Sequence, residues 1–210
     1  MKKLFLIVIS VVAVYYIKPG LFTFSTDGAF DENGNAAVWV FTIDQCGKPC
    51  KKAISILDKR VDYVEFNVSS EKGKMQLLKI GGSNQFPLIV AGNRRILGDN
   101  KMFIVATLAE GIGTHAVTPS ERRVLESHFY DDGTPAIVMY GTSWCPGCKK
   151  LREYFNNKNI EFIELDAEGS ARTDFNILMG GGYPLTYIGY RRIIGLNVGL
   201  IEETMNEFNL

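Results

Sequence analysis

The chain has 210 residues, with 23 lysine and arginine residues balanced by 23 aspartate and glutamate residues. This length fits one large or two small domains, and the 46% hydrophobic and 22% charged content is that of a packed globular protein, which excludes disordered and collagen-like chains. The balanced charge and the lack of a long run of like charge argue against a nucleic-acid partner.

The first twenty residues are typical of an export segment. Lys2 and Lys3 precede an uninterrupted apolar run from Leu4 to Ile17, as in the charged and hydrophobic regions of a secretory signal. As a helix this run spans roughly 21 Å, short of the ~30 Å membrane core, which favours a cleaved signal peptide. The run ends in two tyrosines and an isoleucine, which favours an uncleaved membrane anchor instead. Either alternative places the domains in the periplasm or another extracytoplasmic space; a buried N-terminal helix is the third alternative.

Residues 21–36 are rich in turn formers and are expected to be a spacer. An internal repeat of about one hundred residues follows. The apolar run that ends at Cys46 aligns without a gap with the run that ends at Cys145, and the segments beginning at Pro87 and Pro184 share the pattern Pro-Leu-x-x-x-Gly-x-Arg-Arg-Ile-x-Gly. A repeat of this length is the size of a small domain, so the sequence predicts two tandem domains, at 37–112 and 135–210.

Both copies predict the same elements. The run before the first cysteine has the length and β-branched content of a buried strand, and apolar residues at helical spacing follow the second cysteine. A second strand, a polar helix, a hairpin around a Gly-x turn and a last helix complete each copy. The second strands, polar helices and last helices are expected at 61–67 and 160–166, 71–80 and 170–179, and 99–110 and 197–208. The order β-α-β-α-β-β-α describes a small α/β domain with parallel and antiparallel strand pairs.

Residues 113–134 are expected to link the copies. Thr118 to Glu121 has the spacing of a capping box with proline at the first helical position, which predicts a short helix that ends near Phe129. His115 and His128 both fall in this linker. Neither has a cysteine or carboxylate at ligand spacing, so both are expected to face solvent.

Chemistry is expected at Cys145-Pro-Gly-Cys148, where a strand gives way to a helix. A thiol at a helix N-terminus faces unpaired N–H groups and the positive end of the helix dipole, which favours the thiolate and lowers the thiol pKa. The pattern predicts Cys145 as the nucleophile and Cys148 as the thiol that attacks the mixed disulfide. Trp144 is expected to wall the site with an apolar face for a peptide. A fixed structural disulfide is the alternative, although structural bridges seldom close so short a loop.

The sequence Tyr-Gly-Thr-Ser-Trp-Cys-Pro-Gly-Cys-Lys-Lys, followed by Gly-Gly-Tyr183-Pro184 and a glycine turn, resembles the glutaredoxin family within the thioredoxin fold. The resemblance covers residues 136–208 well and 37–110 more loosely, and implies an α/β chain of two tandem thioredoxin-fold domains. It implies a cis Pro184 against the cysteine pair, with the Tyr183 backbone pairing with substrate like a strand edge. Pro87, preceded by Phe86, holds the same place in the first copy. A plain edge-strand proline is the alternative.

Three segments differ from glutaredoxins that use glutathione. Gly147 replaces the tyrosine between the cysteines, Gly-Tyr183 replaces Thr-Val before the proline, and Gly195-Leu-Asn replaces the Gly-Gly-x-Asp turn that holds the tripeptide. We therefore expect protein thiols and disulfides as partners and keep glutathione only as an alternative co-substrate. No other cofactor and no metal is expected.

The first pair, Cys46-Gly-Lys-Pro-Cys50, has three intervening residues. The extra residue turns the second thiol about 100° round the helix if the helix begins at the same place. The pair closes only if the first turn unwinds or the helix begins later, which Pro49 allows. Lys48 places a cation near Cys46 and favours its thiolate. An active redox pair is the favoured hypothesis, and a vestigial or regulatory pair is the alternative.

These observations predict a thiol–disulfide oxidoreductase that works through Cys145 and Cys148 and through Cys46 and Cys50. Its direction does not follow from composition, because small differences in thiolate and disulfide stability set the reduction potential. A non-catalytic peptide-binding or redox-sensing module is the alternative. One zinc ion on all four thiols is disfavoured by their placement in separate domains, and a bridging iron–sulfur cluster by the altered glutathione turn.

Overall fold

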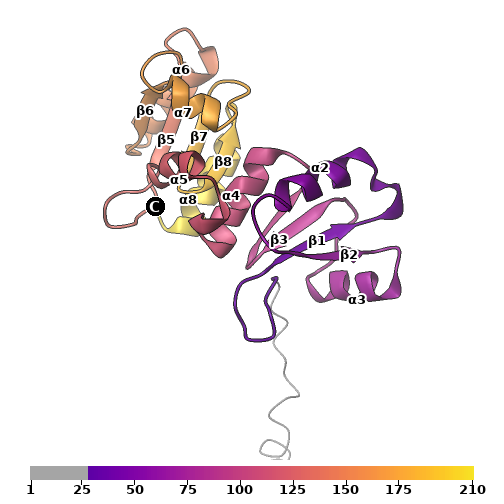
Figure 1. Cartoon of the computed structure of the whole chain (residues 1–210). Coiled ribbons are helices and arrows are strands. Elements are labelled where there is room, and N and C mark those ends of the chain that lie inside the picture. Colours follow the sequence, from indigo (N-terminus) through magenta and orange to yellow (C-terminus); the bar gives the residue numbers. More distant parts are fainter. Residues whose placement is uncertain (1–27) are drawn as a thin grey trace, which may run out of the picture.

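The computed structural model describes residues 28–210, so the expected export segment at 1–20 lies outside the described residues. Within them, no helix has both the length and the apolar character needed to cross a membrane. Two α/β domains follow one another along the chain, each built on a four-stranded sheet (Figure 1).

Apart from a 3₁₀ turn in the first domain, the elements of the two domains correspond one to one. The first domain contains β1 (Val38–Thr42), the 3₁₀ turn η1 (Asp44–Cys46), α2 (Lys48–Leu57), β2 (Val64–Asn67), α3 (Glu71–Lys79), β3 (Leu88–Ala91), β4 (Arg94–Leu97) and α4 (Lys101–Ile112). The second contains β5 (Ile137–Gly141), α6 (Pro146–Asn157), β6 (Ile163–Asp166), α7 (Arg172–Ile177), β7 (Leu185–Ile188), β8 (Arg191–Ile194) and α8 (Val198–Phe208). The linker holds η2 (Thr114–Ala116) and α5 (Pro119–Glu126).

The sheet topology is the same in both domains. The strand orders are β2-β1-β3-β4 and β6-β5-β7-β8, with the first pair of each sheet parallel and the others antiparallel. The central strands β1 and β5 are almost wholly buried, as expected of short apolar runs covered on both faces. The predicted β-α-β-α-β-β-α order and the thioredoxin fold are confirmed for both copies.

The domain boundaries differ from the prediction because each domain begins with a turn upstream of its first strand. The amide of Ala37 donates to the Ala29 carbonyl at 2.9 Å, and the amide of Ala136 donates to the His128 carbonyl at the same distance. Residues 28–36, predicted as spacer, and 128–134, predicted as linker, are therefore equivalent parts of the two domains. The turn-forming composition of these segments predicted the turns correctly, but it did not indicate that the turns pack against the domains.

His128 corrects a second prediction. His115 is exposed as expected, but His128 is completely buried, in the repeat position of the equally buried Ala29. Its ring stacks on Tyr187 with the centroids 4.3 Å apart, and its Nε2 shares a hydrogen bond of 3.0 Å with the Tyr140 hydroxyl. Burial lowers the pKa of His128 to about 3, so the imidazole is neutral in the folded protein.

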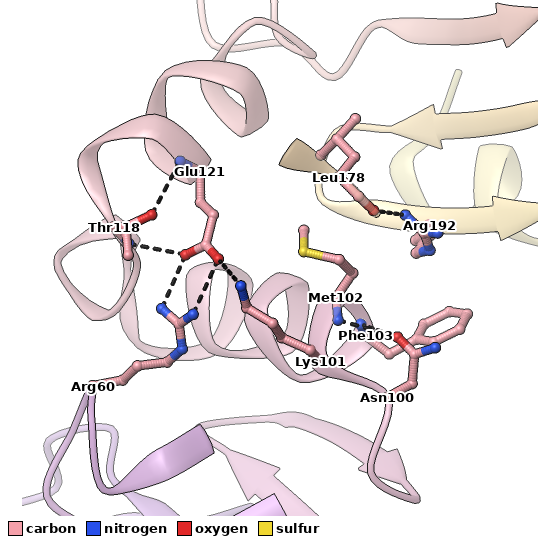
Figure 2. A network of polar contacts seen from close by, with 9 residues as sticks. All are labelled: Arg60, Asn100, Lys101, Met102, Phe103, Thr118, Glu121, Leu178 and Arg192. Atoms are coloured by element: carbon pink, nitrogen blue, oxygen red, sulfur yellow. Dashed lines mark hydrogen bonds and ion pairs between the residues drawn. The ribbon is translucent and has the colours of Figure 1, made fainter. Parts of the chain in front are cut away.

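The predicted capping box is present and has a second task. The Glu121 amide donates to the Thr118 hydroxyl at 3.3 Å, and the Thr118 amide donates to the Glu121 carboxylate at 3.0 Å. That buried carboxylate also accepts two hydrogen bonds from Arg60 of the first domain, at 2.9 and 3.0 Å, and pairs with Lys101 at 3.2 Å (Figure 2). Although burial opposes it, the hydrogen bonds from Thr118 and Arg60 hold the pKa of Glu121 below its usual range. The linker helix is thereby fastened to the first domain.

Helix α4 belongs to the cores of both domains. Ile104 and Leu108 pack in the core of the first domain, whereas Met102, Val105 and Ala109 belong to the core of the second. In Figure 1 this helix lies between the two sheets. A helix that is apolar all round is a buried helix, and the sequence Lys-Met-Phe-Ile-Val-Ala-Thr-Leu-Ala is of this kind. Its counterpart α8 buries one face only.

Four charged residues on repeat-related positions join the domains. Glu110 accepts from Arg94 and from Arg191 at 2.8 Å each, and Glu207 pairs with the same two arginines at 2.5 and 2.8 Å. Arg94 corresponds to Arg191 and Glu110 to Glu207, so the cluster has an approximate twofold symmetry. The hydrogen bond from Arg94, ahead of the charge of Arg191, keeps the pKa of Glu207 low. The cluster and α4 make the two domains one packed unit.

Candidate active site

The second cysteine pair lies where β5 ends and α6 begins. Cys145 is the N-cap residue of α6, and its Sγ accepts a hydrogen bond of 3.1 Å from the Cys148 amide. The two cysteines are joined as a disulfide with their Cα atoms 5.3 Å apart. A sulfur in this position accepts a hydrogen bond from a backbone amide and lies at the positive end of the helix dipole. Both stabilise a negative charge on the sulfur. The structure therefore places Cys145 where the sequence predicted it.

Two glycines allow close packing around this pair. Tyr183–Pro184 is a cis peptide bond, as the resemblance implied. A Cβ atom at position 147 would lie 3.1 Å from Cδ of Pro184 and 3.9 Å from Sγ of Cys145. A Cβ atom at position 141 would lie 3.2 Å from Sγ of Cys148. Gly147 thus leaves room for the ring of the cis proline beside Cys145.

Trp144 and Tyr183 form an aromatic wall held by one carboxylate. Trp144 is 63% exposed, and its ring meets Tyr183 edge to face with the centroids 5.8 Å apart. The indole Nε1 donates to Glu168 at 3.0 Å, and the Tyr183 hydroxyl donates to the same carboxylate at 3.5 Å. Tyr183 also stacks on Phe175, at 5.0 Å. The structure thus places Trp144 against Tyr183 and Glu168, and its role as a wall for substrate stays a prediction.

The sequence did not predict that Glu168 lies at the site. Its only signal was position: it follows the carboxyl end of β6, which runs parallel to β5, so both strands end at the same edge of the sheet as the cysteines. Two exposed apolar residues, Ile194 and Leu196, flank Gly195, whose amide donates to the Pro184 carbonyl at 2.8 Å. The surroundings of Cys145 therefore offer apolar surface together with the carboxylate of Glu168.

The first pair closes in a different way. Turn η1 ends at Cys46, Gly47 follows with a φ of 59°, and α2 begins at Lys48. The later helix start is one of the two solutions that the sequence predicted, and it brings Cys46 and Cys50 into a disulfide with their Cα atoms 5.6 Å apart. Because Gly47 is the N-cap residue, α2 has no side-chain cap, and Cys46 does not hold the capping position that Cys145 holds.

The rest of the first site has the same backbone arrangement as the second but lacks the aromatic wall of Trp144 and Tyr183. Phe86–Pro87 is cis, and the Gly98 amide donates to the Pro87 carbonyl at 2.8 Å, as at Pro184. The repeat positions of Trp144 and Glu168 are occupied by Gln45 and Ser69. Phe86 takes the place of Tyr183 and packs against the domain core. The predicted residues thus gather into two separate sites, one in each domain.

A zinc ion held by all four cysteines is the metal site that the sequence disfavours. Among residues 28–210 no three histidine, cysteine, aspartate or glutamate side chains are grouped as metal ligands would be. The four thiols that a zinc ion would need are paired as two disulfides, one in each domain.

Comparison with known proteins agrees with the geometry. The glutaredoxin family model matches residues 137–193. An uncharacterized glutaredoxin-like 8.6 kDa protein in the rubredoxin operon of Clostridium pasteurianum is 31% identical over 74 residues, which are 34% of this chain and 99% of that protein.

Two solved structures from Enterococcus faecalis are weakly similar. The NTD_N/C domain of alkylhydroperoxide reductase AhpF is 13% identical, with a TM-score of 0.30, over 80% of this chain and 91% of that one. A cysteine mutant of the AhpF subunit is also 13% identical, with a TM-score of 0.29, over 80% and 89%.

Proposed function

Since the chain belongs to the glutaredoxin family, we propose that it is a thiol–disulfide oxidoreductase that acts on protein disulfides through Cys145 and Cys148. The observation that carries the proposal is the N-cap position of Cys145, whose sulfur accepts the Cys148 amide at 3.1 Å beside a cis proline. Thiol–disulfide chemistry is common to the family, whereas the protein substrate is our inference.

The reaction moves two electrons in two exchanges. In the reduced protein the Cys145 thiolate attacks one sulfur of the substrate disulfide, forms a mixed disulfide and releases the other sulfur as a thiolate, which takes a proton from solvent. Cys148 then loses its proton and attacks Sγ of Cys145. The second substrate thiol leaves, and the Cys145–Cys148 disulfide remains. A thiol reductant returns the pair to the dithiol state, and the reverse sequence oxidises a client.

The surroundings of the pair support a polypeptide substrate. Trp144, Ile194 and Leu196 offer exposed apolar side chains, 63%, 46% and 43% accessible, and the backbone before Pro184 is available for strand-like pairing. Apolar surface of this kind suits the residues that flank a disulfide in a protein. The residues that hold glutathione in the family are replaced at positions 147, 182–183 and 195–197. We therefore favour a protein substrate and keep glutathione as the alternative co-substrate.

We propose that Cys46 and Cys50 form a second and less reactive redox pair. The disulfide, the following helix and the cis Pro87 support exchange there. The absence of a sulfur cap on α2 supports a lower reactivity for Cys46. A vestigial or regulatory pair is the alternative.

We also propose that residues 1–20 carry the domains to an extracytoplasmic space, as signal or anchor. The support is the lysine-flanked apolar run of the sequence. Alkaline phosphatase fused after Leu210 should be active in bacteria, whereas an inactive fusion of normal abundance contradicts the proposal.

The functional proposal is tested with serine variants of the full chain in insulin reduction. Cys145→Ser should abolish turnover, and Cys148→Ser should accumulate mixed disulfides at Cys145 that reductant releases. The Cys46→Ser/Cys50→Ser double variant is the matched control, because it removes the other pair and should retain most of the activity. If Cys145→Ser kept full turnover, the assignment would be wrong. If the wild-type chain bound clients without reducing them, the protein would be a binding module.

A further inference from the structure

Arg192 is a buried cation without a carboxylate partner among residues 28–210. Only 7% of the residue is exposed, whereas its neighbour Arg191 pairs with two glutamates. Its Nη1 donates to the Leu178 carbonyl at 2.7 Å and to the Tyr187 hydroxyl at 2.9 Å, and its Nη2 donates to the Met179 carbonyl at 3.1 Å. Burying a guanidinium is unfavourable unless its hydrogen bonds compensate. Here most of that compensation comes from two carbonyls at one place in the chain.

Those carbonyls begin the segment that reaches the active site. Leu178 caps α7, and Met179 has a φ of 48°, in the left-handed region. Three glycines at 180–182 then lead to Tyr183 and the cis Pro184. Glycines give a backbone little rigidity of its own. The Gly180 amide donates to the Phe175 carbonyl at 2.9 Å, and Tyr183 stacks on Phe175. The segment is therefore held by α7 and by Pro184, and Arg192 fixes the two carbonyls from which it starts.

The other face of Arg192 meets the first domain. Its guanidinium lies over the Phe103 ring of α4, 5.7 Å from the centroid, and over the Tyr187 ring at 5.8 Å. Phe103 is held at the start of α4, because the Asn100 side chain accepts hydrogen bonds from the amides of Met102 and Phe103 at 3.1 and 3.3 Å. Figure 2 shows Asn100, Phe103 and Arg192 together, with Arg192 reaching Leu178.

We propose that Arg192 is a positioning residue through which the first domain holds the substrate-pairing segment of the second. Phe103 fixes the guanidinium by cation–π stacking, and the guanidinium fixes the carbonyls from which residues 180–183 start. This inference rests on the proposed function, because it concerns the segment that pairs with the client peptide. It gives the first domain a part in catalysis by the second that does not involve Cys46 or Cys50.

The repeat supplies the matched control. Arg95 is the counterpart of Arg192 and donates to the Ile80 carbonyl at 2.5 Å, at the start of the segment before Pro87. Arg95 is exposed, and the counterpart of Phe103 is Leu200, which has no ring. The first domain therefore has the same arginine-to-carbonyl contact, and the position that corresponds to Phe103 holds a leucine.

The test uses the full chain and two substrates, a peptide disulfide and the small disulfide 5,5′-dithiobis(2-nitrobenzoic acid). Arg192→Lys keeps the charge but loses the fork of donors, and it should raise KM for the peptide about tenfold while the rate with the small disulfide changes less than about twofold. Phe103→Leu should raise KM about threefold. Arg95→Lys should leave both reactions of Cys145 unchanged.

Three outcomes would overturn the inference. An unchanged peptide KM in Arg192→Lys or Phe103→Leu would make the contact purely structural. An equal loss with both substrates would place the effect on the cysteines, and an effect of Arg95→Lys would make it nonspecific. Hydrogen exchange of the amides at 180–183 provides a readout that needs no activity: Phe103→Leu should speed it, and unchanged exchange would contradict the coupling. A wild-type chain inactive on both substrates would instead count against the proposed function.

Discussion

The two domains share a fold, a sheet register and a cis proline, yet they differ in the residue that caps the helix after the first cysteine. In the second domain the capping residue is Cys145 itself, whose sulfur accepts an amide proton. In the first domain it is Gly47, and Cys46 lies one residue earlier, in a 3₁₀ turn. One inserted residue has thus moved a sulfur out of the strongest field at the helix end. After duplication, a site can keep its backbone conformation and lose the interactions that stabilise a thiolate.

The last helices differ in the opposite sense. Helix α4 of the first domain packs in both cores and carries Phe103 to Arg192. The apolar residues of α8 pack in the second domain, and α8 reaches the first domain through the ion pair of Glu207 with Arg94. The repeat has therefore divided its tasks, with chemistry concentrated in the second copy and support for it in the first. Three measurements test this division of tasks between the two domains.

The largest contrast is in the acid stability of the two domains, because buried His128 occupies the place of Ala29. Its pKa is about 3 in the folded protein and near 6.5 when unfolded, so the unfolded chain binds a proton that the folded chain excludes. The stability due to neutral His128 is complete above pH 6.5. It is lost as pH falls towards 3, by about 1.4 kcal/mol for each pH unit.

Urea unfolding from pH 7 to 4, followed by amide exchange in each domain, measures this loss. The second domain should weaken first. His128→Phe keeps a ring beside Tyr187 and should remove most of the slope, at a cost of about 1 kcal/mol at pH 7 for the lost hydrogen bond to Tyr140. His115→Gln, at an exposed position, should leave the profile unchanged. Equal acid sensitivity of both domains, or an unaltered slope in His128→Phe, would contradict the assignment.

His128 also shows why some features could be predicted from the sequence and others could not. Strand and helix order followed from periodicity and from the alignment of the cysteines and prolines, because these patterns record local structure. A lone histidine in a turn carries no periodicity, so its burial was missed. The signal lay in the repeat: Phe30 and Gly34 align with Phe129 and Gly133 at the spacing of the cysteines, which would have extended both domains upstream.

The sequence of α4 contains a signal for the domain interface. The apolar residues of α4 surround the helix, whereas those of α8 form one face, and this difference predicts a helix buried between two partners. The contacts of Glu168 and Arg192 had no such signal. Their partners come from separate elements, and their geometry depends on how the strands and domains pack.

The second measurement compares the two nucleophiles. In the Cys46→Ser/Cys50→Ser variant and in Cys145→Ser/Cys148→Ser, each reduced pair is alkylated alone with iodoacetamide at pH 7. We expect Cys145 to react about tenfold faster than Cys46, because its sulfur receives an amide proton and the helix dipole. Equal rates would show that Lys48 compensates at Cys46. Deletion of Lys48 restores the two-residue spacing and should raise the rate of Cys46.

The smallest expected effect tests the aromatic wall, which the first domain lacks. Glu168 holds the Trp144 indole at 3.0 Å and the Tyr183 hydroxyl at 3.5 Å. Glu168→Gln keeps an acceptor for both and removes the charge, whereas Glu168→Ser copies Ser69 and removes both contacts. Both hydrogen bonds are exposed to solvent, which screens the charge of the carboxylate, so each contributes about 1 kcal/mol or less.

The two substitutions at Glu168 therefore separate position from charge. If the carboxylate acts by holding the rings, Glu168→Ser should raise KM for a peptide disulfide about threefold and Glu168→Gln should stay near wild type. If it acts by its charge, both variants should lose the same preference for peptides with lysine or arginine beside the disulfide, measured against acidic peptides of equal length. A wild-type KM in both variants would show that Trp144 and Tyr183 keep their places by packing alone, through the stack of Tyr183 on Phe175.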